Sequence, residues 1–197
     1  MGKLCSQCIT ILATVFLVML ISAYFMLKFS AIAPQSLNLQ YKGDHLNIHF
    51  NAKGVPIITA STFNAFIYAV GYMHAHYRLW DMTIKRSMAS GRMSEIFGER
   101  TLQMDKFFRI YNFEKASEQS VNSLPLDMKA TYQSFADGIN DCAKRNILLP
   151  IEFLITRSKF ADWTISNTLE MMKYVSFSLN MSIVLIRYVL GNKNNSL

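Results

Sequence analysis

The stretch of the chain that decides the fold runs from residue 69 to residue 98 and reads AVGYMHAHYRLWDMTIKRSMASGRMSEIFG. From residue 63, just before this stretch, to residue 88 within it, apolar residues recur at spacings of three, four and seven, which is typical of one face of an α-helix. This stripe consists of Phe63, Phe66, Ile67, Val70, Tyr77, Ile84 and Met88. Ala69, Gly71 and Ala75 are small enough to let another element approach this helix closely.

The ends of this helix can be predicted from its flanking residues. Ser61 or Thr62 can cap its first turn, because a hydroxyl oxygen accepts a hydrogen bond from a free backbone N–H. We expect a break near Ser90 and Gly91, and at the latest at Gly98.

Upstream of the helix, the pattern changes to that of short strands. Leu46, Ile48 and Phe50 alternate with polar residues, which is the period of a half-buried strand. Residues 51–54 (Asn-Ala-Lys-Gly) predict a turn, and a second short strand begins at Val55.

Downstream, helical patterns dominate. Met104 to Tyr111 forms one helical face, and Pro125 stands in the first turn of another helix that extends to Cys142. We interpret Cys142 as a packing residue rather than a nucleophile, since it falls on the apolar face of that helix. Residues 148–155 are predicted to form a short apolar connector.

A last helix is expected from about Asn167 to Leu190, with Asn167 and Glu170 as a capping pair. Its uncharged centre is too short to cross a membrane, so we expect a buried core helix. The fold class is therefore α+β and predominantly helical.

The N-terminal segment from Ile9 to Leu27 contains nineteen residues without a charge, between Lys3 and Lys28. This length is sufficient for a transmembrane helix, so we predict a single-pass anchor with residues 34–197 outside the cytoplasm. Three alternatives remain open: a signal peptide cleaved after residues 31–33 with secretion of the rest, a buried helix, and lipidation at Gly2 or Cys5.

These patterns divide the chain into four parts. Residues 1–33 are the cytosolic tail and anchor, 34–44 a polar linker, 45–190 the folded region, and 191–197 a polar tail.

Composition excludes several classes of protein. Of the 197 residues, 51% are hydrophobic and only 17% are charged, which excludes an intrinsically disordered chain. The formal net charge is +7, but the basic residues are interspersed with acidic ones. We therefore predict no binding to nucleic acid.

The chain carries few patterns of catalytic or metal-binding residues. His74 and His76 are two residues apart, which on a helix places the imidazoles on different sides. A zinc-binding helix needs a spacing of four. No Gly-x-Ser-x-Gly motif and no glycine-rich phosphate loop is present. The residues by themselves thus indicate neither a catalytic centre nor a metal site.

The stretch from residue 69 to 98 nevertheless resembles the N-terminal signature of the penicillin acylase (penicillin amidase) family of N-terminal-nucleophile hydrolases. Further segments match that family in the same order. They are residues 54–60 (GVPIITA), 105–109 (DKFFR), 132–140 ending in FADGIN, 149–153 (LPIEF), and Asp162-Trp163. The resemblance covers about residues 45–190.

The resemblance implies that this chain corresponds to the α portion of such an enzyme. Family members cleave a precursor into α and β portions, and the first residue of the β portion, a serine, is the nucleophile. Its own α-amine acts as the base. The implied fold is the α-chain part of a four-layer αββα hydrolase, and the implied activity is amide hydrolysis. No residue of this chain matches a catalytic residue, so the implied partner is a β portion.

The resemblance also implies roles for residues of the last helix. Counted from Trp163, the acyl pocket falls at Ser176, Phe177 and Asn180. Members with aromatic acyl groups carry apolar side chains there, so the two polar residues speak against a phenylacetyl-type pocket. The family's structural calcium takes one carboxylate from this helix. Residues 183–186 (IVLI) offer none, so we expect no calcium to bind through this chain.

Residues of the main motif are expected to be structural. They are Arg78, Trp80, Arg86, Gly91, Arg92, Glu95 and Gly98. The charged members are interpreted as scaffold ion pairs, and the glycines as helix terminators. The family usually has Gln-Asp where His76 and Tyr77 stand, so Arg78 or Arg86 lacks that ion-pair partner here.

Three functional hypotheses follow from the sequence. The first is the α portion of an anchored amide hydrolase, the second a non-catalytic anchored remnant that binds other proteins as a scaffold. The third is an unrelated small helical membrane protein.

Overall fold

The computed structural model describes residues 2–30, 36–145 and 149–194. Within them the chain is predominantly helical with one small sheet, which confirms the predicted α+β class. The chain divides into two compact units, which are described separately. One contains residues 1–37 and 48–57, the other residues 38–47 and 58–197.

In the first unit, helix α1 (Gly2–Ser30) contains the N-terminal apolar segment. In the described part of the chain, no helix is both long enough and apolar enough to span a membrane. The predicted transmembrane helix, membrane contact through Ile9 to Leu27, and single-pass placement of residues 34–197 are therefore wrong.

Three strands form a sheet in the order β1-β2-β3. They are β1 (Ser36–Tyr41), β2 (Asp44–Phe50) and β3 (Pro56–Ala60). The two-residue connection from β1 to β2 requires an antiparallel pair. Strands β2 and β3 agree with the predicted ones. Strand β1 lies within the predicted 34–44 linker, because buried Leu39 and Tyr41 alternate with exposed polar residues there.

In the second unit, helix α2 (Phe63–Ala89) begins where the sequence predicts. The Thr62 hydroxyl accepts a hydrogen bond from the Ala65 N–H at 3.2 Å and donates one to Asp44 at 2.7 Å. The helix ends at Ser90, followed by Gly91 with φ of +62°. A kink at Arg78, which has non-helical backbone angles, was not predictable from any proline or glycine.

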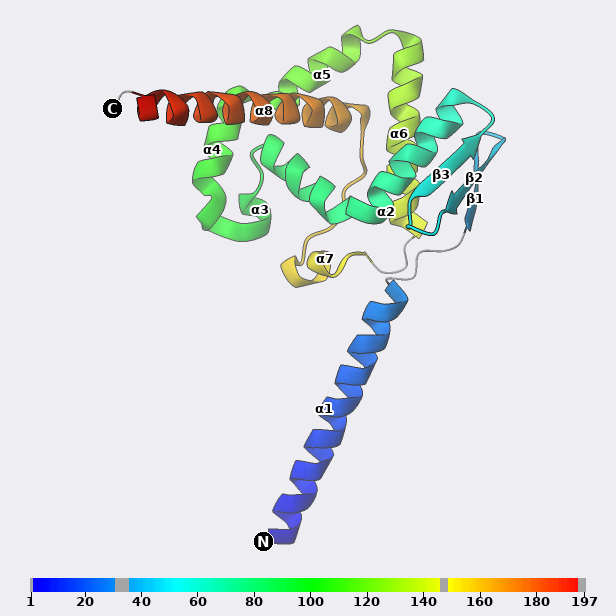
Figure 1. Cartoon of the computed structure of the whole chain (residues 1–197), viewed down its shortest axis with the longest axis vertical. Helices are drawn as coiled ribbons and strands as arrows, with labels where there is room; N and C mark the ends of the chain where they lie inside the picture. The colour runs from blue at the N-terminus through cyan, green and yellow to red at the C-terminus, as the bar shows by residue number, and fades with distance from the viewer. Residues whose placement is uncertain (1, 31–35, 146–148, 195–197) are drawn as a thin grey trace. The chain divides into compact units, whose positions relative to one another are not determined.

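Helix α6 (Leu126–Arg145) packs closely against α2 (Figure 1). Ala69 and Ala75 of α2 are buried, as the small residues of the quoted stretch predict, and so is Ala65 before it. Tyr41 of β1 stacks on Tyr68 of α2 with ring centroids 4.5 Å apart. The core of this unit therefore lies between α2, α6 and β1.

The remaining helices are α3 (Ser94–Phe97), a 3-10 turn η1 (Gly98–Thr101), α4 (Leu102–Tyr111), α5 (Phe113–Ser123), α7 (Ile151–Thr156) and α8 (Ile165–Asn194). Two expectations need correction. The predicted connector at 148–155 contains α7, in which the apolar residues form a short helix. The cap of α8 is Thr164 with Asn167, whose Oδ1 accepts hydrogen bonds from the Thr164 N–H and hydroxyl. Glu170 interacts with the Asn167 side chain but not with Thr164, so the capping hydrogen bonds join Asn167 to Thr164 rather than to Glu170.

Candidate functional site

Three charged residues of the main motif, Arg86, Arg92 and Glu95, gather at the C-terminal end of α2. Arg86 donates hydrogen bonds to the carbonyl oxygens of Ala161 and Asp162, at 3.0 and 3.3 Å. Its guanidinium also lies 5.2 Å from the Trp163 ring centroid, in a cation–π contact. Burial lowers the pKa of Arg86, which nevertheless stays charged. Arg86 therefore fastens the 160–163 segment to α2 through carbonyls and a ring, not through an ion pair.

Arg92 and Glu95 form the predicted type of ion pair. The guanidinium donates to both carboxylate oxygens, at 2.8 and 3.0 Å. The hydrogen bond with Arg92 lowers the pKa of Glu95. Because both side chains are more than half exposed, this pair contributes little to stability.

Two residues of α4 hydrogen-bond to the backbone of the segment that connects α2 to α3. Asp105 is buried and accepts hydrogen bonds from the N–H groups of Met93 and Ser94, at 2.8 and 2.7 Å. Arg109 donates to the carbonyl of Gly91 at 2.9 Å. A Cβ on Gly91 would lie 2.6 Å from the Asp105 carbonyl oxygen, so glycine is needed there for space as well as for its positive φ. Gly98, with φ of +72°, has open space around it.

A buried carboxyl lies beside this cluster. Glu170 of α8 is 1% exposed, and its Oε1 accepts a hydrogen bond from the Ser90 hydroxyl at 2.7 Å. Its Oε2 has no hydrogen-bond partner among the described residues. Burial raises the pKa of Glu170, and the Glu114 carboxylate raises it further, against the hydrogen bond from Ser90. The sequence places Glu170 in a cap, and only its position within an apolar turn hinted at burial.

A polar cavity of about 370 Å³ lies next to Ser90, between the end of α2, the 158–162 segment and the start of α8. It is lined by Arg86, Arg92, Glu95, Glu114, Lys159 and Asp162, with the hydroxyls of Thr83, Ser87, Ser90 and Ser158. Of the predicted motif residues, Arg86, Arg92 and Glu95 thus lie together. No signal in the sequence indicated that Glu114, Lys159 and Glu170 join them.

Arg78 and Trp80 lie elsewhere on α2. Both line a second cavity of about 640 Å³, with Pro150 and Glu152 on its other side. The Trp80 ring packs edge-to-face on buried Phe153 of α7, with centroids 4.9 Å apart. This contact joins α7 to α2, and the structural role of Trp80 stays a prediction.

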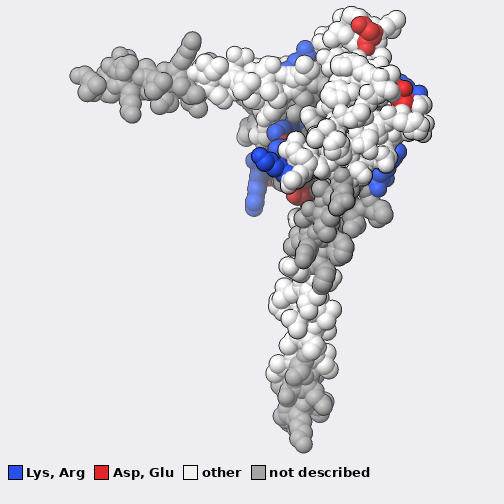
Figure 2. Space-filling model, turned by 45° about the vertical axis from the view of Figure 1, so that its right-hand side comes forward, with Lys and Arg blue, Asp and Glu red and all other residues white. Residues whose placement is uncertain are grey.

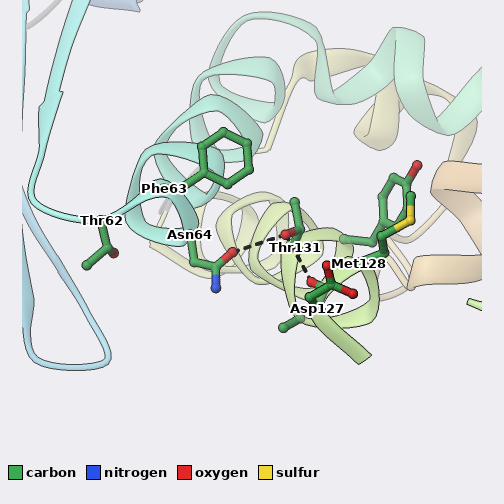
Figure 3. A pocket seen from close by; sticks show the side chains of 8 residues that line it. Thr62, Phe63, Asn64, Asp127, Met128 and Thr131 are labelled. Carbon is green, nitrogen blue, oxygen red and sulfur yellow. Dashed lines mark hydrogen bonds between the residues drawn. The ribbon is translucent and has the colours of Figure 1, made fainter. Parts of the chain in front are cut away.

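A third cavity, of about 620 Å³, lies between the starts of α2 and α6 (Figure 3). Phe63, Asn64, Asp127 and Met128 are among its lining residues. The Thr131 hydroxyl shares its proton between the Asn64 side-chain oxygen at 3.2 Å and the Asp127 backbone carbonyl at 3.1 Å. This cavity offers no reactive group.

The predicted acyl-pocket residues do not converge in this chain alone. The exposed Ser176 hydroxyl donates to the Met172 carbonyl, and the exposed Asn180 amide donates to the Ser176 carbonyl, each at 2.9 Å. Phe177 instead joins an aromatic cluster of α4 and α5, with its ring centroid 4.5 Å from that of Tyr111. The expected substrate-binding role of these residues stays a prediction.

Metal-binding groups are sparse. Among the described residues, no three His, Cys, Asp or Glu side chains come together. Glu170 is the only carboxylate of α8, and it is buried against Ser90. The residues present therefore do not fit the calcium site that the family resemblance implies.

The comparison with known proteins identifies the family. The family model described as penicillin amidase matches residues 45–193. This chain belongs to the penicillin amidase family. The resemblance inferred from the quoted stretch is thereby confirmed.

Two curated relatives are acylases. The acyl-homoserine lactone acylase QuiP of Pseudomonas aeruginosa is 33% identical over 96 residues, which are 49% of this chain and 11% of the relative. The penicillin acylase 2 proenzyme of Pseudomonas sp. strain SE83 is 25% identical over 146 residues, which are 73% of this chain and 19% of the relative. The chain thus spans a tenth to a fifth of the length of these relatives.

A solved structure has the same fold. The thermostable penicillin G acylase from Alcaligenes faecalis superposes with a TM-score of 0.62 at 20% identity. The match covers 76% of this chain and 84% of that chain.

The pKa of Glu170 leads to a prediction on pH. A carboxyl with a folded pKa raised above its ordinary 4.5 contributes stability below that pH, and this contribution is lost as the pH rises through the folded pKa. We expect Glu170→Gln to flatten this dependence and to exceed the parent in unfolding free energy at pH 8 by about 1 kcal/mol. Urea denaturation from pH 4.5 to 8 measures both. Glu118→Gln, at an exposed position on α5, is the control, and an unchanged pH slope in Glu170→Gln would contradict the assignment.

Proposed function

We propose that this chain is the α portion of an amide hydrolase and completes the four-layer αββα fold of a β portion that carries the serine nucleophile. The family assignment and the acylase relatives support this proposal. Most of the length of each relative lies outside the matched region, which leaves room for the reacting groups there. Whether the β portion is encoded in the same gene or a separate one does not change the proposal.

The observation that carries it is an apolar stripe on α8. Met172, Val175, Leu179 and Ile183 follow one another at spacings of three and four, and each is between 45% and 62% exposed. Figure 2 shows the described part of this helix as uncharged on the face in view. Contiguous exposed apolar surface marks a binding interface. A second polypeptide portion that covers the stripe accounts for it.

The polar residues beside the stripe suggest what such an interface encloses. Ser176 and Asn180 lie along its edge, on the side of the helix toward Phe177. A β portion packed on the stripe would remove both side chains from water, next to the acyl group of the substrate. Because a buried hydroxyl and amide need hydrogen-bond partners, such a pocket favours an acyl chain with polar atoms over a phenylacetyl group.

The family chemistry assigns the steps of amide hydrolysis to the β portion. The serine hydroxyl attacks the amide carbonyl, its proton passes through the terminal amine to the departing amine, and water then hydrolyses the ester. Nothing in this chain supplies the nucleophile or the base. Its own contribution is to position the substrate acyl group through α8.

The first test is reconstitution. Translation of the genomic sequence beyond the Leu197 codon in all frames should reveal a segment that begins with serine. Co-expression of both portions should release amine from N-acyl substrates, whereas each portion alone should release none. If the native protein purifies alone and lacks amidase activity, the non-catalytic scaffold protein is the better description.

The stripe itself can be tested by substitution. Leu179→Asp is expected to weaken binding of the β portion at least about tenfold. The substitution removes a leucine whose burial in the complex contributes about 2 kcal/mol, and it buries a charge there instead. Met181→Asp, on the opposite side of the same helix and 46% exposed, is the matched control. Sedimentation or pull-down of the purified portions measures the loss. Equal behaviour of the two variants would argue against docking through the stripe.

A further inference from the structure

The polar cavity at the end of α2 carries charges of both signs, and most of them are already paired. Glu95 is bound by Arg92, and Asp162 lies 3.6 Å from Lys144. Among the described residues, Arg86 and Lys159 on one side and Glu114 on the other form no ion pair. The cavity therefore presents two cations and one anion that a ligand can reach.

The cations and the anion come from different elements. Arg86 belongs to α2 and Lys159 to the segment that precedes α8, whereas Glu114 belongs to α5. One nitrogen of Arg86, Nη1, donates to two carbonyl oxygens, and its other nitrogens form no hydrogen bond with the described residues. Ligand carboxylates bind readily to such guanidinium donors.

A buried acceptor lies beside Glu114. Glu170 interacts electrostatically with Glu114, and Ser90, which lines the cavity, binds the Glu170 Oε1. The Glu170 Oε2 is buried without a partner in the described chain. Glu170 does not line the cavity itself, but its carboxyl lies next to it through Ser90 and interacts electrostatically with Glu114.

We infer that this cavity binds a small zwitterion of the α-amino-acid class. The ligand carboxylate lies between Arg86 and Lys159, and its ammonium group faces Glu114. A volume of about 370 Å³ is at the lower end for small-molecule sites, which suits a ligand of this size. A simple anion leaves Glu114 with only the Arg92 charge that it shares with Glu95, and a simple cation is repelled by Arg86 and Lys159. The site is independent of the proposed hydrolase function.

The test is titration calorimetry of the full chain at pH 7 with L-alanine, acetate and methylamine. We expect saturable binding of L-alanine with a Kd on the order of 1 mM, at least tenfold tighter than either of the other two. Lys159→Gln and Glu114→Gln should each weaken L-alanine binding at least fivefold. Lys106→Gln and Glu118→Gln, exposed positions outside the cavity, should leave it unchanged.

Lys159 and Glu114 are exposed, so their substitution is not expected to disturb the fold. Circular dichroism of the variants checks that they fold like the parent. Acetate binding as tightly as L-alanine would overturn the zwitterion assignment in favour of an anion site. No saturable heat with L-alanine, or equal loss in the control variants, would overturn the site itself.

Discussion

Gly138→Ala is expected to destabilise the chain by about 3 kcal/mol, one of the two largest effects of a single substitution predicted for this fold. A Cβ at position 138 of α6 would overlap the Tyr68 carbonyl oxygen and lie 2.8 Å from the Tyr72 nitrogen. Both atoms belong to the backbone of α2, so no side chain can move aside. The helices must separate, and overpacking of this kind costs more than the about 1 kcal/mol that alanine gains in helix propensity.

Gly71→Ala tests the same crossing from the other helix. Its Cβ would overlap the Phe135 carbonyl oxygen of α6. Urea denaturation followed by circular dichroism measures both losses, with Gln133→Ala on the exposed side of α6 as the control at less than about 0.5 kcal/mol. A Gly138→Ala variant as stable as the parent would mean that α2 and α6 do not cross this closely.

The crossing is also the part of the fold that the sequence predicts best. Gly71 and Ala75 are four residues apart on one side of a helix that is capped by Thr62, so the helix, its start and the close approach all follow from local residues. Local patterns also predict β2, because its alternation is regular. The family resemblance then rests on the same stretch, which explains why fold and family could be inferred together.

Features that depend on distant partners were predicted poorly. Strand β1 reads as a polar linker because only Leu39 and Tyr41 are buried, and the Tyr41 hydroxyl is anchored by Ser134 and Asp137, more than ninety residues away. Helix α7 has six residues and depends on Phe153 packing against Trp80.

The candidate site shows the same limit. The motif supplied Arg86, Arg92 and Glu95, which are close together in sequence. Glu114 and Glu170 come from α5 and α8. They lie near Ser90 because of the way the helices pack, which cannot be predicted from the spacing of residues along the sequence. For α1, the apolar segment predicted a helix correctly. A membrane span also requires a minimum length combined with a minimum hydropathy, and no helix among the described residues meets both.

Asp105→Ala is expected to cost about 3 kcal/mol, because it leaves the buried N–H of Met93 and the N–H of Ser94 without their acceptors. Each of these bonds joins a charged carboxylate to the backbone, which is stronger than a bond between neutral groups. Asp105→Asn keeps one acceptor oxygen and places an NH₂ group against the second N–H, so an intermediate loss is expected. Glu99→Gln, exposed in η1, is the matched control.

The pH dependence of Asp105 separates this bond network from simple packing. Burial by itself raises the pKa of Asp105, but the hydrogen bonds from Ser94 and Met93 and the charge of Arg109 outweigh it and lower the pKa below the ordinary 3.8. A lowered folded pKa contributes stability above pH 3.8 and loses it as the pH falls through the folded value. The parent should therefore lose stability on acidification below pH 4 more steeply than Asp105→Asn. Since Glu170 has the opposite sign and window, the double variant Asp105→Asn with Glu170→Gln should show the flattest profile, and parallel curves for all four proteins would refute both assignments.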